Sequence, residues 1–424
     1  MIGDSEYSSI RLQKRLIQIL YIIGNHAADK EGYTVRIEFS DKIKKNKRKA
    51  AVFAMFLIAS AFLVPVILPA TAVFAVACTP NAGGTGLSAF MVVSTSHTTV
   101  NGKAINAAGC DIGVYIAPGT KYVTVTDSTI MGANDHAIFA QDAQHITITH
   151  NLAINNGING GHSCNVAPAP CVSEDKGIQF AGTSNSLIGW NVVSNASADG
   201  GIGVTDDNVT FDSAALTPSA TKAFAGTNDV VTGNTVDTSL LGCGIVIATY
   251  DENAGIHNIT VTRNTIVGTS PAGAMAGLPP YIGQIVVAID AQNSKLSDVK
   301  VEHNSIVGSL LPGIVVHSNV FGDKLLNVQI IGNTIADNGF YPPDFATGPN
   351  DPQAGNGTTG ISVIAEIGLF GPLPNPIASH TVIKGNTILG DTNGIWLCGT
   401  TNSVISGNSG NPTNALVKCP AGAK

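Results

Sequence analysis

The sequence predicts an all-β solenoid: a single-stranded right-handed parallel β-helix that follows an N-terminal signal or anchor segment. Two repeated positions in the 424-residue chain predict this fold. One is an Asn that closes a short alternating strand, and the other is a Gly-Ile pair that opens a second apolar strand. No helical periodicity of comparable length follows residue 78. One such coil cannot bury its apolar side alone, but stacked coils bury a continuous core and pair in parallel.

The Asn position reads Val-Thr-Arg-Asn-Thr-Ile at 261–266 and Val-Glu-His-Asn-Ser-Ile at 301–306. The whole column is Asn151, Asn191, Asn234, Asn264, Asn304, Asn333, Asn386 and Asn408, with Asp127 expected in the same place one coil earlier. We expect the stacked amides to hydrogen-bond from coil to coil. The apolar column is Val114, Ile138, Ile178, Ile202, Ile245, Ile285, Ile314, Ile361 and Ile395, usually preceded by Gly.

Over residues 90–410 this pattern resembles the right-handed parallel β-helix repeat proteins of the pectate-lyase-like superfamily. The resemblance implies one solenoid domain and, for exported members, action on long glycans. It does not select an activity, because this architecture hosts lyases, hydrolases, epimerases and non-enzymatic surface proteins. No catalytic motif of the superfamily transfers residue by residue.

The N-terminal region differs in composition from the rest of the chain. Residues 1–49 form an extension that ends in a basic run, and residues 50–77 carry no charge and close on Ala75-Val76-Ala77. This order is typical of a secretory signal peptide, and a retained membrane anchor is the alternative. We therefore expect a secreted or cell-surface protein whose β-helix domain spans 78–424, with membrane contact only through 50–77 if that segment is uncleaved.

Charge and cysteine content limit which partners the chain can have and which cellular compartment it can occupy. From Cys78 onward, 11 Lys and Arg residues stand against 23 Asp and Glu residues, a net charge of −12 with Arg263 as the single arginine. Such a chain repels nucleic acid and anionic membranes, so we expect no nucleic-acid partner. In an exported chain we expect disulfides. The expected pairs are Cys164–Cys171, Cys398–Cys419 and Cys78–Cys110, which leave Cys243 as a thiol.

An acidic column lies three residues before the apolar column: Asp111, Asp135, Asp175 and Asp199, in four consecutive coils. Carboxylates at a strand spacing of about 4.8 Å repel by about 3 kcal/mol per pair at an effective dielectric near 20. His136 and Lys176 can supply positive charge, and bound Ca²⁺ or a raised pKa can also relieve the repulsion. The candidate catalytic residues are Asp135, Asp175, Asp199, His136 and Lys176, and the candidate Ca²⁺ ligands are Asp111, Asp135, Glu174 and Asp175. The alternative is ordinary turn architecture, because Asp before Gly is common in turns.

A second acidic group follows the Gly-Ile strands: Asp206, Asp207, Asp251, Glu252, Asp290 and Glu366. Solvated turn acids are the leading interpretation, and a glycosidase carboxylate pair is the alternative. Aromatic side chains that can stack on sugar rings are Tyr281, Tyr341 and Trp396. We expect Trp396 and Phe139 to point outward from their strands, where loops or a partner can cover them, and we expect His317 to be a surface histidine.

These observations favour a polysaccharide partner. Glycoside hydrolysis by paired carboxylates ranks above uronate elimination, because a lyase must hold acidic sugars and the chain has one arginine after Cys78. The alternative is a non-catalytic surface or carbohydrate-binding β-helix whose Asp columns are turns or Ca²⁺ sites. Apart from Ca²⁺ we expect no cofactor, since the chain has no convincing nucleotide-binding, zinc-protease or serine-hydrolase motif.

Overall fold

The computed structural model describes residues 77–82, 87–157, 176–194, 200–206, 226–237, 243–250, 254–268, 283–289, 293–308, 312–318, 324–336, 358–365, 378–398 and 400–418. The chain divides into Met1–Ala72 and Val73–Lys424, and every described residue belongs to the second unit. Within the described ranges, no helix is both long enough and apolar enough to cross a membrane. The basic extension and, apart from Ala77, the predicted signal or anchor lie outside these ranges.

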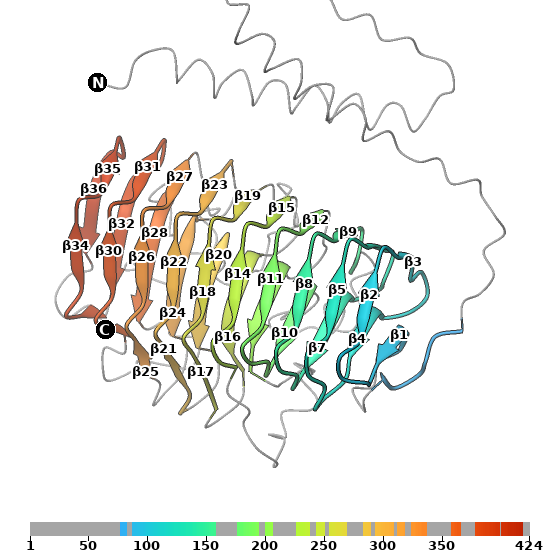
Figure 1. Ribbon diagram of the computed structural model, residues 1–424. Helices are drawn as coiled ribbons and strands as arrows, with labels where there is room; N and C mark the ends of the chain where they lie inside the picture. The colour runs from blue at the N-terminus through green and yellow to red at the C-terminus, as the bar shows by residue number, and fades with distance from the viewer. Residues whose placement is uncertain are drawn as a thin grey trace, which may run out of the picture. The chain divides into compact units, whose positions relative to one another are not determined.

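Four parallel sheets run through the described residues (Figure 1). Sheet A is built from β1 (Ala89–Val93), β4 (Ile112–Ile116), β7 (His136–Gln141), β10 (Lys176–Ala181), β13 (Gly200–Thr205), β16 (Cys243–Thr249), β20 (Ile285–Ile289), β24 (Ile314–Ser318), β28 (Thr359–Ala365), β32 (Asn393–Cys398) and β36 (Asn414–Lys418). Sheet B is built from β2 (Thr99–Asn101), β5 (Thr124–Thr126), β8 (Thr147–Thr149), β11 (Leu187–Gly189), β14 (Val230–Thr232), β18 (Thr260–Thr262), β22 (Lys300–Glu302), β26 (Gln329–Ile331), β30 (Val382–Lys384) and β34 (Val404–Ser406).

Sheets C and D complete the coils. Sheet C is built from β3 (Ala104–Asn106), β6 (Thr129–Met131), β9 (Leu152–Ile154), β12 (Val192–Ser194), β15 (Thr235–Asp237), β19 (Thr265–Val267), β23 (Ser305–Val307), β27 (Thr334–Ala336), β31 (Thr387–Leu389) and β35 (Ser409–Gly410). Sheet D is built from β17 (Gly255–His257), β21 (Lys295–Ser297), β25 (Lys324–Leu326), β29 (Ala378–Ser379) and β33 (Thr400–Thr401), between sheets A and B of the later coils.

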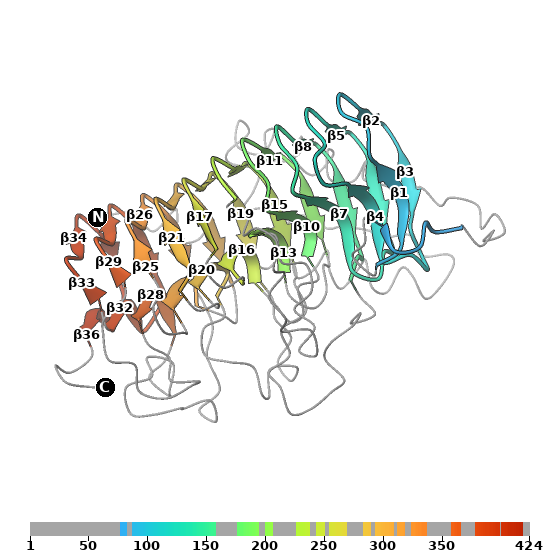
Figure 2. The ribbon, with the colours of Figure 1, turned by 90° about the horizontal axis from the view of Figure 1, so that it is seen from below.

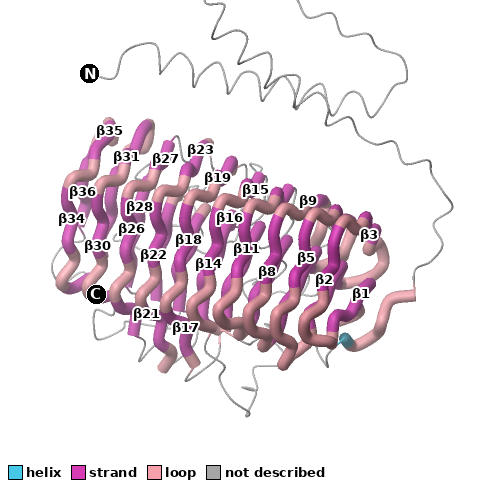
Figure 3. The backbone as a smooth tube through the Cα atoms, in the orientation of Figure 1, coloured by secondary structure: helices cyan, strands magenta, loops and turns pink. Residues whose placement is uncertain are grey.

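Each strand pairs with the strand at the same place in the next coil, and Figures 1 and 2 show this order from β1 to β36. Figure 3 shows short strands joined by turns in every coil. The domain is therefore a right-handed parallel β-helix, and the predicted fold class is confirmed.

The apolar column has the predicted register. Val114 pairs with Ile138, Ile138 with Ile178, and the pairing continues coil by coil to Ile395. The preceding Gly has a steric cause, because a Cβ at Gly201 would meet the Val236 side chain and lie 2.8 Å from the carbonyl oxygen of Gly244. A larger residue would push the coils apart.

The Asn column forms a continuous ladder from Asn151 to Asn408. In each step, the backbone N–H and the side-chain amide of one Asn donate to Oδ1 of the next Asn, at 2.9–3.0 Å. The expected place of Asp127 in this ladder is wrong by one residue. Ser128 donates its N–H to Asn151 Oδ1, while Asp127 is exposed at the preceding position with φ +50°.

The disulfide Cys78–Cys110 is present, and Cys243 is a buried thiol. Both agree with the sequence-based expectation. Cys164, Cys171 and Cys419 lie outside the described residues.

Candidate functional site on the outward face of sheet A

Sheet A has a core side and an outward side, and both are buried in the strands from β4 to β24. Ile138, Ile178 and Ile202 belong to the main core. The outward side carries two further apolar clusters. The first contains Ala82, Ala89, Ile112, Tyr115, Phe139 and Ala181, and the second contains Cys243, Val246, Ala248, Tyr250, Val286, Ala288 and Val315. The outward side is therefore a second packed surface.

Four buried polar side chains lie on β7, β10 and β13. They are His136, Lys176, Gln179 and Thr205, and each exposes 4% or less of its surface. Gln179 Nε2 donates to Thr205 Oγ1 at 2.7 Å. Its Oε1 is buried and has no hydrogen-bond partner among the described residues. Gly203 makes room for this amide, because a Cβ there would collide with Gln179 Oε1.

His136 is a neutral residue at ordinary pH. Burial lowers the pKa of its imidazole to about 4, and the hydrogen bond between Nδ1 and the Lys176 carbonyl at 3.0 Å offsets only part of this. The ring stacks on Phe139, with centroids 5.1 Å apart. The prediction that His136 supplies positive charge to the acidic column is therefore wrong, because a buried imidazole loses its hydration when it is protonated.

Asp111 holds the turn between the first two coils. Its Oδ2 accepts hydrogen bonds from the N–H and the hydroxyl of Ser88, both at 2.7 Å, and its Oδ1 accepts one from Asn134 Nδ2 at 3.2 Å. These contacts are turn chemistry, the alternative interpretation of the acidic column. Asp135, the next member of the column, is 2% exposed and directly precedes His136.

Among the described residues, no three His, Cys, Asp or Glu side chains are grouped so that they could hold a metal ion. Of the predicted Ca²⁺ ligands, Asp111 already accepts hydrogen bonds through both oxygens. Glu174, Asp175 and Asp199 lie outside the described residues. The described part of the column thus does not by itself make a Ca²⁺ site.

The second acidic group includes one residue that differs from the expectation of solvated acids. Asp206 is fully buried at the end of β13, and both of its carboxylate oxygens accept the Tyr250 N–H, at 2.9 and 3.0 Å. Asp206 and Asp135 belong to opposite ends of their strands, so they do not form a pair. Asp207, Asp251, Glu252, Asp290 and Glu366 lie outside the described residues.

The predicted outward aromatic side chains are covered. Phe139 is 1% exposed and Trp396 is 6% exposed, so Trp396 as it lies offers no ring face to a sugar. His317 was expected at the surface but is 1% exposed, because the outward side of sheet A is packed there as well. Tyr281 and Tyr341 lie outside the described residues.

Sequence reasoning missed Gln179, Thr205 and Tyr115. Burial, with Asp142 as a lesser cause, raises the pKa of the Tyr115 hydroxyl above its usual value, and this hydroxyl donates to Gln141 Oε1 at 2.8 Å. Aligning the sheet A strands would have shown Gln179 as a polar residue in a mostly apolar outward column. Gln179 stands between Phe139 and Gly203 in a column that becomes Val246 and Val286 further on.

No protein-family model matches the chain. A search of curated proteins also finds no match. Among solved structures, the chain is similar to an exopolygalacturonase from Thermotoga maritima, at 11% identity and TM-score 0.43 over 70% of this chain and 55% of that one. It is similar to a GH87 α-1,3-glucanase from Streptomyces thermodiastaticus, at 16% identity and TM-score 0.46 over 79% and 52%. It is also similar to an alginate lyase from Paenibacillus, at 13% identity and TM-score 0.41 over 77% and 90%.

The chain spans about half the length of the first two of these enzymes. At these identities the likeness is one of fold, and it assigns no activity to this chain.

Proposed function

We propose that the protein is a secreted or cell-surface β-helix that hydrolyses a neutral polysaccharide along the outward face of sheet A, over β7, β10 and β13. One observation carries the proposal: four buried polar side chains, His136, Lys176, Gln179 and Thr205, lie on these three consecutive strands, and Gln179 donates a hydrogen bond to Thr205. Gln179 and Thr205 are the members of this group that carry no charge, which suits a neutral partner. The buried Oε1 of Gln179 is an acceptor that a hydroxyl donor would stabilise.

The proposed chemistry needs two carboxyl groups. In the sequence, Asp135 and Asp175 each stand three residues before the Ile column, at Ile138 and Ile178, so a strand spacing of about 4.8 Å is expected between them. This is close to the roughly 5 Å separation of retaining glycosidases. In this scheme Asp135, which is almost fully buried, donates the proton to the leaving oxygen, and Asp175 is the nucleophile.

The shortage of cationic side chains on this face supports hydrolysis over uronate elimination. A lyase must bind the carboxylates of its substrate, and the described part of this face offers Lys176 as its cationic side chain, which is fully buried. A neutral glycan needs no such cation. The Cys78–Cys110 disulfide supports the extracytoplasmic location, because disulfides persist in oxidising compartments.

A direct test incubates the full chain with dextran, xylan and galactomannan as neutral polymers and with alginate and polygalacturonate as acidic ones, with and without a chelator. We expect new reducing ends from a neutral polymer and no unsaturated uronate products. Asp135→Asn should lower the rate by about a hundredfold or more. Asp127→Asn, at an exposed turn, is the matched control and should leave the rate unchanged. Unsaturated products from the acidic polymers alone would overturn the proposal.

The second candidate is a non-catalytic carbohydrate-binding protein. It is favoured by Asp111 and Asp206, whose carboxylates accept hydrogen bonds within the fold. Polymer binding without release of reducing ends, unchanged in Asp135→Asn, would establish this candidate instead.

A further inference from the structure

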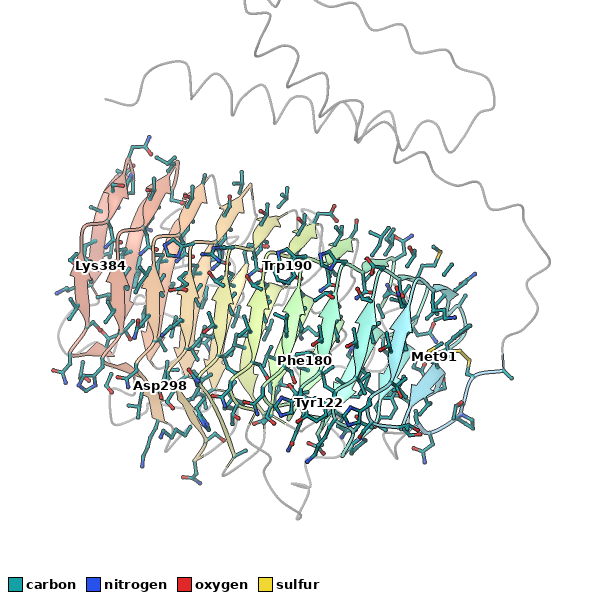
Figure 4. The ribbon with its side chains drawn as sticks, viewed as in Figure 1. Met91, Tyr122, Phe180, Trp190, Asp298 and Lys384 are labelled. Atoms are coloured by element: carbon teal, nitrogen blue, oxygen red, sulfur yellow. A yellow bond between two sulfur atoms is a disulfide. The ribbon has the colours of Figure 1, made fainter. Side chains whose placement is uncertain are left out.

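We propose that the corner between sheets B and C at Trp190 is a second binding site for a neutral polysaccharide chain, separate from the outward face of sheet A. The inference rests on the proposed function in taking a polysaccharide as the ligand. Trp190 follows β11 and precedes β12, and Figure 4 shows it at the upper end of the sheet B strands, with Tyr122 at the lower end.

Trp190 is exposed in the middle of the stack. The large exposed apolar side chains of the described residues are Tyr122, Trp190, Val192, Val404 and Leu416. Val404 and Leu416 belong to the last strands of sheets B and A, which pair on one side only. Trp190 exposes 51% of its surface and Val192 exposes 38%, although coils pair on both sides of them. The end of the stack therefore does not explain the exposed indole.

The backbone at Trp190 is strained, with φ +54°. Other positive-φ residues at the same place in their coils are Asp127, His150, Gly233, Arg263, His303, Gly332, Gly385 and Gly407. A non-Gly residue in this region costs on the order of 1–3 kcal/mol, and Gly removes the cost. Asp, His and Arg also occupy this place in other coils, so the positive φ belongs to the corner itself, and what distinguishes Trp190 is its large exposed ring.

Two neighbours fix the orientation of the indole. Its ring stacks on His150, with centroids 5.6 Å apart and an interplanar angle of 12°. In the next coil stands Gly233, where an added Cβ would lie 2.7 Å from Trp190 Cδ1. The ring therefore occupies the space that a side chain at 233 would need. A ring held in this way loses little freedom on binding.

The adjoining surface has the chemistry of a neutral glycan site. Gly189 pairs in register with Thr149 on one side and Thr232 on the other, so hydroxyl groups flank a position without a side chain beside the indole. The outward side chains of β2, β5, β8, β11, β14 and β18 carry no charge. Hydroxyls can bond to sugar hydroxyls while the indole contacts the apolar face of a sugar ring. These sheet B strands favour a neutral chain over a polyanion, while charged side chains enter the surface at Asp127 and Arg263 of the corner and at Asp237 of β15.

The two tryptophans of the chain allow a specific test. In full-length Trp396→Phe, Trp190 is the remaining tryptophan, and its emission can be followed during titration with dextran, xylan, galactomannan and polygalacturonate. We expect a saturable change with at least one neutral polymer and none with polygalacturonate. No change with any polymer would overturn the inference. A change caused by protein concentration alone would also overturn it, because it would show that a second copy of the chain covers Trp190.

Affinity electrophoresis in gels that contain the responsive polymer gives the second readout. Trp190→His, which places there the residue found at 150 and 303, should weaken retardation roughly three- to tenfold with an unchanged unfolding midpoint. Val404→Ala, also an exposed apolar side chain, is the control and should not change it. Retardation of Trp190→His equal to wild type would contradict the inference.

The two proposals fail separately. Retardation that depends on Trp190 without any hydrolysis would overturn the proposed function and support this binding site. Hydrolysis with retardation that does not depend on Trp190 would support the proposed function and overturn this binding site.

Discussion

The Thr183 hydroxyl donates a 2.6 Å hydrogen bond to Oδ2 of Asp229, and both side chains are fully buried. The Ser186 N–H donates to Oδ1 at 2.8 Å. Asp229 precedes β14 at the place where Ile259 precedes β18, so a carboxyl group occupies a position that the next coil fills with a core residue. Burial raises the pKa of Asp229 to about 7, and the two hydrogen bonds offset only part of this effect.

Asp229→Asn should stabilise the protein at high pH. The pKa of Asp229 in the folded state lies above its ordinary value of 3.8, so the stability that the carboxyl group contributes is complete below about 3.8 and is lost as the pH rises through about 7. Asn keeps an acceptor for Ser186 without the buried charge. We expect the free energy of unfolding to rise by up to roughly 4 kcal/mol at pH 8 and to change little at pH 4, measured by urea titration. Equal gains at both pH values would contradict this account, and Asp298→Asn, an exposed acid, is the control.

The fold was predictable because coil-to-coil columns repeat along the sequence. The Ile column and the Asn ladder follow from the fixed side-chain directions of short strands. The site was less predictable. His136, His317 and Trp396 lie on the outward side of sheet A, and a strand pattern does not show whether that side is covered. Asp229 was missed for a related reason, since an acid beside a turn has the same sequence signal whether it points into the core or into solvent.

Asn264→Ala should be strongly destabilising. Oδ1 of Asn264 accepts the backbone N–H and side-chain amide of Asn234, and Nδ2 donates to Val231 and Asn304. Removal leaves several buried polar groups without partners, at a cost of about 2–4 kcal/mol in the free energy of unfolding. Asn408→Ala, at the partly exposed end of the same ladder, should cost clearly less in the same urea titration. Equal costs would mean that burial does not set the strength of the ladder.

Gly233→Ala tests the packing of Trp190. Gly233 and Gly385 occupy the same place in their coils with φ +66° and +65°, but a Cβ at 385 meets nothing within 4 Å. Gly385→Ala should therefore cost about 1 kcal/mol for backbone strain alone. Gly233→Ala should cost about 1–2 kcal/mol more, because the indole must move. This excess should vanish in the Trp190→Ala background, which removes the ring, and an excess that persists there would show that Trp190 is not its cause.

His136 and Asp229 should act on stability in opposite directions over the same pH range. The folded-state pKa of His136 is about 4, below its ordinary 6.5, so its contribution is complete above about 6.5 and is lost as the pH falls through about 4. The contribution of Asp229 is lost as the pH rises from 3.8 through about 7. At about 1.4 kcal/mol per pKa unit, the two effects are roughly 3 and 4 kcal/mol and largely cancel in the wild type. In urea titrations from pH 4 to pH 7, the free energy of unfolding of Asp229→Asn should therefore rise with pH, and that of His136→Gln should fall.

The free energy of unfolding of the double variant should change little with pH, since the two side chains belong to different faces of the coils and their effects should add. Parallel slopes in the two single variants would show that neither buried group sets the pH dependence.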